Sequence, residues 1–214
     1  MNLTLFKVLT TKLKQNTLAG EFAHSVMAPP YRIENIKSSL ISEMKHKMAS
    51  VLLLLYPNEF GEMNFVLTRR REYNGMHSGQ ISFPGGKPDL LDNDLWATAL
   101  RETHEEIGIL SDEVKYIRSL SKLYVPPSNF LIVPYIGYLQ SPYTFKPDPR
   151  EVDAILEISL MDFINKESVL MKQLNSNSNF IVVPAYIFDK NVVWGATAMI
   201  LSEFKMLFSA VLAK

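Results

Sequence analysis

The stretch that decides the fold is GGKPDLLDNDLWATALRETHEEIG, residues 85–108. A glycine pair opens it, directly after a short β-prone run at residues 80–84, and an acidic loop follows. The spacing of apolar residues then predicts a helix over residues 94–107, with Gly108 as its C-cap. At about 100° per residue, four side chains form one apolar stripe on this helix. They are Trp96, Leu100, Thr103 and Ile107.

Three glutamates occupy a different side of the same helix. Glu102, Glu105 and Glu106 fall on an arc of about 100°, centred roughly 140° from the apolar stripe. We therefore expect the stripe to pack on a core while the carboxylates project from it together. Carboxylates this close resist ionisation unless a cation lies among them. The pattern predicts a divalent-metal site, and oxygen-only ligands favour Mg²⁺ or Mn²⁺; the alternative is a solvated acidic face.

Composition narrows the classes of function. The 214 residues contain 22 Lys+Arg and 22 Asp+Glu, so no net charge attracts the chain to nucleic acid or to a membrane. Cysteine is absent, which excludes disulfides, thiolate metal sites and a cysteine nucleophile. The first residues lack the features of a signal peptide, and the apolar run 51–56 is too short to span a bilayer. We expect a cytoplasmic protein, monomeric or homodimeric, that binds a small molecule.

The rest of the chain alternates between apolar segments and turn-forming residues. Helices are expected at residues 3–16, 35–48, 94–107, 160–164 and 195–213. Strands are expected at residues 51–56, 64–68, 80–83, 114–120, 131–139, 152–158, 180–188 and 192–194. The buried side of the last helix should carry Met199, Ile200, Phe204, Leu207 and Val211. This order indicates one α/β or α+β domain over residues 1–214, with a mixed sheet sandwiched between helices.

The spacing of the glycines, arginine and glutamates resembles the Nudix box of diphosphate hydrolases. Gly86 is followed by five residues and Asp92, then by eight residues and the run from Arg101 to Gly108. The general box has glutamate in place of Asp92 and seven residues in place of eight. Both departures look like the coenzyme A pyrophosphatase branch of the superfamily.

That branch also carries an upstream motif, which this chain matches in part. The matching segments are residues 66–70 (VLTRR) and 77–86 (HSGQISFPGG). Arg71 stands where the branch prefers Ser or Ala, and Gly75 stands where it prefers a second arginine. The resemblance covers about residues 49–205 and leaves residues 1–48 as an N-terminal helical extension.

The resemblance implies a Nudix-like fold and metal-dependent hydrolysis of the diphosphate of coenzyme A or its derivatives. The products would be 3′,5′-adenosine bisphosphate and 4′-phosphopantetheine. One alternative is a Nudix pyrophosphatase for another nucleoside diphosphate derivative, such as ADP-ribose, a dinucleotide or a nucleoside triphosphate. The other is a nucleotide-binding module without catalysis, which the three retained glutamates disfavour.

Diphosphate hydrolysis assigns roles to the acidic residues. Glu102 and Glu106, one helical turn apart, can hold one divalent ion. Glu105 can take a second ion or bind through water, and Arg101 at i−4 can orient it by an ion pair. The proton of the attacking water goes to one of these carboxylates or to Glu151, a choice that the sequence leaves open.

Basic and glycine residues are the expected substrate contacts. Arg69, Arg70, Arg71 and Lys87 form a local basic patch suited to a polyanion, or else a solvated strand end. Arg70 matches the arginine of the branch motif and is the first choice among them. Gly85 and Gly86 would let the backbone turn sharply and approach metal or phosphate. The motif adds Gln80 and His77, and His77 could instead fix its loop.

Overall fold

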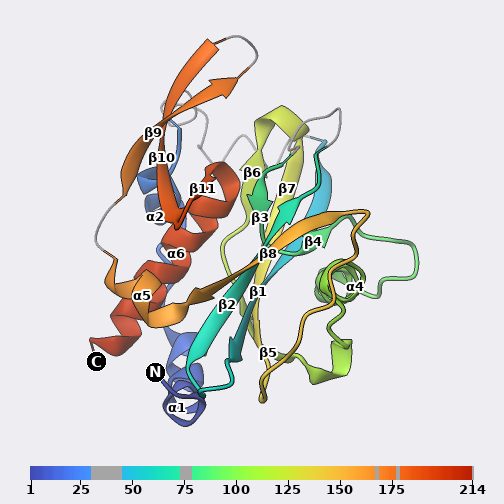
Figure 1. Ribbon diagram of the computed structural model, residues 1–214, viewed down its shortest axis with the longest axis vertical. Coiled ribbons are helices and arrows are strands. Elements are labelled where there is room, and N and C mark those ends of the chain that lie inside the picture. Colours follow the sequence, from blue (N-terminus) through green and yellow to red (C-terminus); the bar gives the residue numbers. More distant parts are fainter. Residues whose placement is uncertain (30–44, 73–78, 167–168, 177–178, 214) are drawn as a thin grey trace.

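A mixed β-sheet forms the centre of the computed structural model, which describes residues 1–29, 45–72, 79–166, 169–176 and 179–213 (Figure 1). The strands of this sheet are β1 (Lys47–Pro57), β2 (Met63–Arg70), β3 (Ile81–Ser82), β4 (Gly85–Gly86), β5 (Lys115–Ser119), β6 (Leu123–Val125), β7 (Phe130–Tyr138) and β8 (Val152–Ser159). Their order is β3-β2-β1-β7-β5, and β4 pairs with β1, β6 with β7 and β8 with β2.

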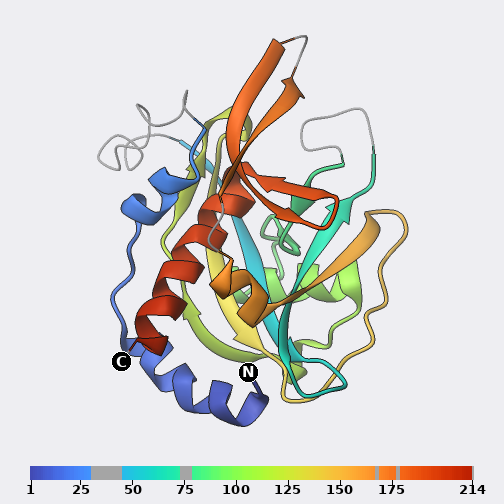
Figure 2. The same ribbon diagram turned by 60° about the vertical axis from the view of Figure 1, so that its left-hand side comes forward.

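A second sheet is antiparallel and has three strands in the order β11-β10-β9. Its strands are β9 (Leu170–Ser176), β10 (Asn179–Phe188) and β11 (Asn191–Trp194). The β9–β10 hairpin projects from the body of the molecule (Figures 1 and 2).

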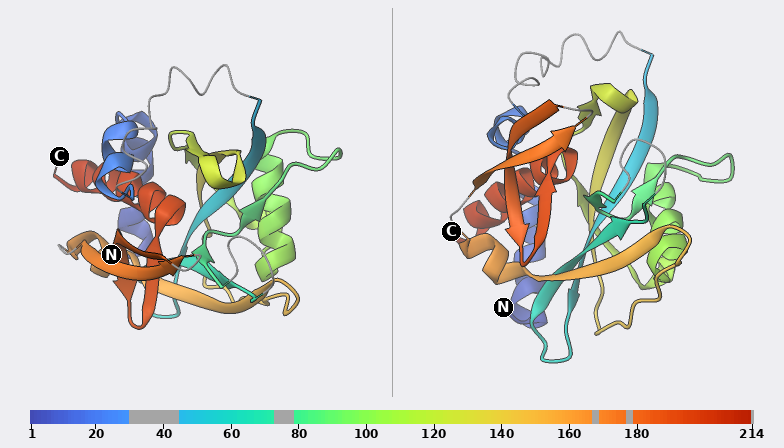
Figure 3. Two further views of the ribbon diagram at one scale, coloured as in Figure 1. Left: turned by 90° about the horizontal axis from the view of Figure 1, so that it is seen from above. Right: turned by 45° about the horizontal axis from the view of Figure 1, so that its top comes forward.

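The described helices are α1 (Leu3–Gln15), α2 (Glu21–Val26), α4 (Leu95–Ile107), α5 (Leu160–Asn165) and α6 (Gly195–Leu212). Two short 3₁₀ turns are also present: η2 (Ser111–Glu113) lies between α4 and β5, and η3 (Pro126–Ser128) lies between β6 and β7. Helix α4 covers one face of the large sheet, whereas α6, with α1 and α2 beside it, lies on the other side (Figure 3).

Strand β1 organises the sheet. It runs parallel to β7 from the pair Lys47–Phe130 onward, and antiparallel to β2 and β4. Its side chains alternate between two cores. Leu52 and Leu54 join a core under α4, and Leu53 and Leu55 join a larger core under α6. A strand buried on both faces explains the unbroken apolar run in the sequence.

Residues near the N-terminus belong to the α6-side core. Phe6, Leu9 and Leu13 of α1 are buried in it, and so is Met27 just after α2. Helix α6 is long and apolar enough to cross a membrane by those two criteria alone. Most of it is buried against these neighbours, so its apolar composition is that of a core helix.

Most of the expected elements are present, with shifted ends. The helix expected at residues 3–16 is α1, the one at 94–107 is α4, and the one at 195–213 is α6. The five side chains expected on the buried side of α6 are all buried. The fold class, a mixed α/β arrangement of sheet and helices, is confirmed.

Several expected elements were wrong or missing. The helix expected at residues 35–48 lies mostly outside the described residues, and positions 47 and 48 begin β1 instead. Helix α2, strands β6 and β9 and the two 3₁₀ turns were not foreseen. The expected strand at residues 80–83 shrinks to two residues, and the glycine pair, expected as a turn, forms a strand of its own.

Candidate functional site

The glycine pair lies flat against β1. In this antiparallel ladder Val51 faces Gly85 and Ser50 faces Gly86. Gly85 has φ +147, and a Cβ there would lie 2.3 Å from the Ser50 carbonyl oxygen. A Cβ on Gly86 would lie 2.4 Å from Cδ of Glu102. Gly85 therefore needs glycine both for its backbone conformation and because β1 fills the space of a side chain, whereas at Gly86 the Glu102 carboxylate fills that space. Neither glycine makes the sharp turn expected from the sequence, since the pair forms β4.

Helix α4 presents its three glutamates in three different environments. Asp94 caps its start, with the side chain accepting from the Ala97 N–H at 2.7 Å, and Gly108 ends it in the left-handed conformation at φ +80. Glu102 lies against Gly86, Glu105 is half exposed, and Glu106 is 3% exposed.

The expectation that all three glutamates project from the core together is therefore wrong for Glu106. The buried side of α4 runs through Thr98, Ala99, Thr103, Glu106 and Ile107, while Trp96 and Leu100 are only partly buried. The helix packs against the narrow β4 edge as well as against the apolar centre, which draws Glu106 inward.

Glu106 is a buried carboxylate with an incomplete set of partners. The backbone N–H of Gly85 donates to it, but Oε2 has no hydrogen-bond partner among the described residues. The pKa of Glu106 is raised to about 8, mainly by burial. The charge of Arg70 opposes this rise, and the charges of Glu102 and Glu151 add to it. Three charged residues therefore act on one buried carboxylate.

Arg101 joins most of the acidic residues of the site. Its guanidinium binds Asp92 through two contacts of 3.0 Å and donates to the Lys87 carbonyl at 2.9 Å. It also donates to Glu102 at 3.1 Å and to Glu105 at 3.2 Å. The Glu105 contact is the expected ion pair, but Asp92 has the better geometry. Hydrogen bonding from Arg101 holds the pKa of Asp92 far below its usual range.

Glu102 is stabilised less completely. Burial raises its pKa, the adjacent Arg101 opposes the rise, and the charges of Glu105 and Glu151 add to it. A carboxylate so placed is more costly to ionise than one in water. A cation at this position would remove that cost.

The three expected phosphate-binding arginines separate in space. Arg69 pairs with Asp153 at 2.7 Å and contacts the Asn191 side chain at 3.4 Å. Arg71 donates to the Pro149 carbonyl at 2.9 Å. Arg70 is the one whose charge acts on Glu106.

The other expected contacts have different positions. Glu151 accepts a backbone hydrogen bond from Arg71 at 2.9 Å, and its own side chain is exposed. The Gln80 carbonyl accepts from the Arg70 N–H at 3.0 Å. Lys87 lies 5.6 Å above the ring of Phe130. His77 and Gly75 lie outside the described residues.

Asp92 is a site residue that we did not assign a role from the sequence. It fixes Arg101, and its signal was already present, since it occupies the acidic position of the box between Gly86 and Arg101. Local spacing does not predict that a loop residue such as Asp92 will bind a helix residue nine positions further along the chain.

The donors for a divalent cation are present but not gathered. Among the described residues no three Asp, Glu, His or Cys side chains form a ready-made metal site. Arg101 is bound to Glu102 and Glu105 instead. Their chemistry still fits a hard divalent ion, because such ions prefer carboxylate oxygens. Oε2 of Glu106 has no partner, and the Glu102 carboxylate lies nearby against Gly86. Glu102, Glu105 and Glu106 fit that role by their chemistry.

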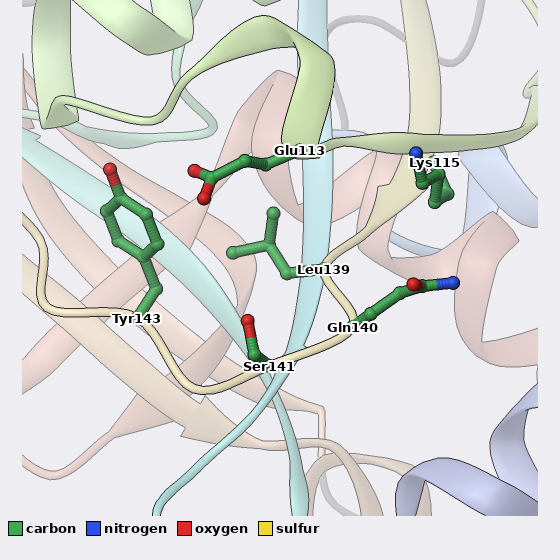
Figure 4. A pocket seen from close by; sticks show the side chains of 6 residues that line it. All are labelled: Glu113, Lys115, Leu139, Gln140, Ser141 and Tyr143. Carbon is green, nitrogen blue, oxygen red and sulfur yellow. The ribbon is translucent and has the colours of Figure 1, made fainter.

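A cavity elsewhere does not contain these residues. It has a volume of about 200 Å³ and is lined by Glu113, Lys115, Leu139, Gln140, Ser141 and Tyr143 (Figure 4). That is below the roughly 300 Å³ at which small-molecule sites usually begin. None of the predicted site residues lines it.

Solved structures of low sequence identity support the fold alone. A Nudix hydrolase from M. smegmatis, RenU, superposes with a TM-score of 0.53 at 14% identity, over 77% of this chain and 87% of its own. A MutT/nudix family protein from Enterococcus faecalis gives a TM-score of 0.51 at 14% identity, over 92% and 82% of the two chains.

Sequence comparison reaches closer relatives. Nudix hydrolase 15, mitochondrial, of Arabidopsis thaliana is 32% identical over 73% of this chain and 57% of its own length. The uncharacterized Nudix hydrolase NudL of Photorhabdus laumondii is 31% identical over 64% and 73%. The human mitochondrial coenzyme A diphosphatase NUDT8 is 30% identical over 64% and 59%. The chain spans little more than half the length of the two plant relatives that it matches.

The family model for the NUDIX domain matches residues 46–176, which include the glycine pair, α4 and Glu151. That match covers more than half of the chain and agrees with the relatives and with the fold. The chain therefore belongs to the NUDIX domain family, and its relatives are named as hydrolases.

Proposed function

We propose that this protein is a divalent-metal-dependent pyrophosphohydrolase acting on coenzyme A or its derivatives. Water and the substrate diphosphate would give 3′,5′-adenosine bisphosphate and 4′-phosphopantetheine. Nudix hydrolases generally use divalent metal ions and act on small nucleotide derivatives, which supports the reaction class. The upstream motif and a relative named as a coenzyme A diphosphatase support the substrate.

One observation carries the reaction class: Glu106 is a buried carboxylate whose Oε2 has no hydrogen-bond partner among the described residues, and the charges of Glu102, Glu151 and Arg70 act on it. A buried anion without full partners is costly to a folded protein. It is explained where the fold prepares it for a cation that binds with the substrate.

The residues of the site then have distinct roles. Glu102 and Glu106, with Glu105, would hold Mg²⁺ or Mn²⁺, which neutralises phosphate charge and polarises the phosphoryl group when bound. Arg70, whose charge acts on Glu106, would bind the diphosphate. Arg101 acts through Asp92 and the glutamates, so it positions them rather than touching the substrate.

The water that attacks phosphorus needs a base that solvent can reach. Glu105 and Glu151 are exposed, whereas Glu106 is buried. One of the two exposed carboxylates accepts the proton of that water as the phosphorus–oxygen bond to the leaving group breaks. Comparing Glu105→Gln with Glu151→Gln identifies which, because replacing the true base removes the acidic limb of the pH–rate profile, where the rate rises as that carboxylate ionises.

A substrate panel tests the proposal. Coenzyme A, acetyl-coenzyme A, ADP-ribose, ATP and a dinucleoside polyphosphate are each incubated with Mg²⁺ and with Mn²⁺, and products are separated by chromatography. We expect coenzyme A to have the highest kcat/KM and to give both named products. Glu106→Gln should abolish turnover, while Glu113→Gln, the same change at an exposed glutamate of η2, should not. Faster cleavage of ADP-ribose or ATP would overturn the coenzyme A assignment.

Another nucleoside diphosphate derivative is the second candidate substrate. The observation favouring it is that few arginines remain available to bind the phosphates of coenzyme A. Gly75 replaces the second arginine of the branch motif, and Arg69 and Arg71 are bound to Asp153 and Pro149. If Gly75→Arg leaves the KM for coenzyme A unchanged, the missing arginine has no bearing on substrate choice.

The remaining expectations belong to the same proposal. We place the protein in the cytoplasm, as a monomer or homodimer, without nucleic acid or membrane as partner. Residues 1–28 form part of the same folded unit as the NUDIX domain, since α1 and α2 pack on α6. Size-exclusion chromatography with light scattering measures the oligomeric state.

A further inference from the structure

Ser50 carries a buried hydroxyl without a partner. The residue is 0% exposed, and its Oγ has no hydrogen-bond partner among the described residues. Leaving a hydroxyl unpaired in the interior costs about 1–3 kcal/mol. Alanine would pack in a comparable space at no such cost, so a serine here calls for an explanation.

The register of β1 places this hydroxyl on the functional side of the sheet. Leu52 and Leu54, which share the face of Ser50 by alternation, belong to the core under α4. Ser50 lies directly opposite Gly86 in the antiparallel ladder. Residues opposite one another point to the same face, with Cβ positions about 4.5–5.5 Å apart.

The place beside Ser50 is occupied by Glu102. At Gly86 an added Cβ would meet Cδ, Oε1 and Oε2 of Glu102 at 2.4, 2.5 and 2.5 Å. The carboxylate therefore fills the position that a side chain opposite Ser50 would take. Ser50 and the Glu102 carboxylate therefore lie on the same face of the β1–β4 ladder.

In the present structure Glu102 takes its hydrogen bond from Arg101 at 3.1 Å. Arg101 is already bound to Asp92 and to the Lys87 carbonyl, so it remains in place when Glu102 leaves it. When one oxygen of a carboxylate binds a cation, its second oxygen still needs a hydrogen-bond donor. Metal ligands that are oriented by such a hydrogen bond bind the metal more tightly. A hydroxyl is suited to this because its hydrogen can rotate toward an acceptor.

We infer that Ser50 is a positioning residue for the metal site, and that its hydroxyl donates to the Glu102 carboxylate when Glu102 binds a divalent cation. The inference rests on the proposed function, because it requires that Glu102 be a ligand. It extends that function to a residue of β1, outside both the glycine pair and α4. The competing explanation is that Ser50 only fills space.

Metal binding without substrate separates these explanations. Mn²⁺ is titrated into wild type, Ser50→Ala and Ser50→Cys by calorimetry, and the free ion is followed by electron paramagnetic resonance. Removing an outer-shell partner commonly costs about 10–100-fold in metal affinity. We expect both variants to bind Mn²⁺ at least about tenfold more weakly than wild type. The Tm of both Ser50 variants in chelator should equal that of wild type or lie slightly above it, since an unpaired buried hydroxyl has been removed.

Ser202→Ala is the matched control. It removes another buried serine hydroxyl, from α6 and therefore from the other side of the sheet. We expect it to leave Mn²⁺ affinity unchanged. If Ser50→Ala does not fold, Ser50→Cys keeps the size of the side chain with a weaker donor and decides the question.

The outcomes are distinguishable. Wild-type Mn²⁺ affinity in folded Ser50→Ala or Ser50→Cys would overturn the role of Ser50 and leave the proposed function standing. If neither wild type nor Glu106→Gln binds Mn²⁺, the proposed metal site is wrong, and the inference about Ser50 is wrong with it. A loss in the Ser50 variants with Ser202→Ala unaffected supports both.

Discussion

The Glu102 carboxylate lies where the side chain of residue 86 would be, so Gly86 and Glu102 share one space. A Cβ on Gly86 would come within 2.4 Å of Cδ of Glu102, closer than real contacts allow. Gly86 has no positive φ, so the need for glycine comes from this contact and not from the backbone conformation. The second glycine of the pair is therefore part of the glutamate's binding surface.

Gly86→Ala should displace Glu102 and impair catalysis far more than stability. Misplacing a reacting group by about 1 Å can cost 10²-fold in rate, and we expect kcat/KM to fall by about that much. Mn²⁺ affinity should fall as well. Steady-state kinetics and calorimetry measure the two effects.

Gly61→Ala is the comparison for this change. Gly61 has φ +77 and open space around it, so alanine there costs about 1–2 kcal/mol of conformational strain without touching the site. Its kcat/KM should equal that of wild type. Equal kcat/KM in Gly86→Ala and wild type would mean that Glu102 is not placed by this contact.

Arg101→Lys should disrupt the site because an ammonium cannot reproduce the planar contact with Asp92. Arg101 binds both Asp92 oxygens at 3.0 Å while reaching Glu102 and Glu105. We expect kcat to fall by about 10–100-fold with a smaller change in KM, as for other residues that orient metal ligands.

Arg150→Lys offers the matched control for Arg101. Arg150 also grips a carboxylate, Asp148, at 2.6 Å, but it is exposed and contacts none of the α4 glutamates in the structure. Surface pairs of this kind contribute about 0–1 kcal/mol, so activity and stability should both stay near wild type. A kcat loss of similar size in both variants would point to a general effect of losing arginine.

The sequence predicts long, strongly patterned elements well. Helices α1 and α6 follow from the periodicity of their apolar residues, strand β1 follows from its unbroken apolar run, and the ends of α4 follow from Asp94 and Gly108. Elements of two or three residues, such as β4 and β6, carry no period to detect, because their pairing with β1 or β7 is decided by the whole sheet.

Within the site, residue types were predictable but their environments were not. The helical wheel puts Glu102, Glu105 and Glu106 on one arc, yet it cannot tell which side of that arc β4 will cover. The same limit applies to the arginines, since Arg69 is bound by Asp153, 84 positions away along the chain. Ser50 gave no signal at all, because its meaning depends on the register that sets it opposite Gly86.

Glu106→Gln should stabilise the metal-free protein at alkaline pH. The pKa of Glu106 is raised from an ordinary 4.5 to about 8. The folded state therefore holds this proton more tightly than the unfolded state does. The stability contributed by the bound proton is complete below the unfolded pKa and is lost as pH rises through the folded pKa. At about 1.4 kcal/mol per pKa unit, the loss in wild type amounts to a few kcal/mol.

Urea unfolding in chelator at about pH 5 and about pH 9 checks this sign. Wild type and Glu106→Gln should have similar free energies of unfolding at the lower pH, since Glu106 is then neutral. The variant should be the more stable protein at the higher pH. Glu113→Gln, at an exposed position, should track wild type at both. A variant less stable than wild type at about pH 9 would contradict the buried position of Glu106.

A second buried carboxylate, Glu203 of α6, should stabilise the protein in its ionised form, whereas Glu106 stabilises it in its protonated form. It accepts hydrogen bonds from the Gly20 N–H at 2.9 Å and from the Ser121 N–H at 3.0 Å, and it lies 3.4 Å from Nε2 of His24. Burial alone would raise its pKa, but the nearby His24 ring and the hydrogen bonds from Ser121 outweigh burial and lower it. The carboxylate thereby ties the segment before α2, and α2 itself, to α6.

Glu203→Ala should therefore destabilise the protein by about 3–5 kcal/mol at neutral pH, because it leaves the N–H donors of Gly20 and Ser121 without their acceptor. A group whose pKa is lowered by folding contributes stability above its pKa in the unfolded state, and this stability is lost as pH falls through its pKa in the folded state. The difference in free energy of unfolding between wild type and variant should therefore shrink toward about pH 3. Urea unfolding at both pH values measures it. Glu21→Ala, at an exposed position of the same α2, should cost little at either pH. A difference that is the same at both pH values would mean that Glu203 acts through packing and not through its charge.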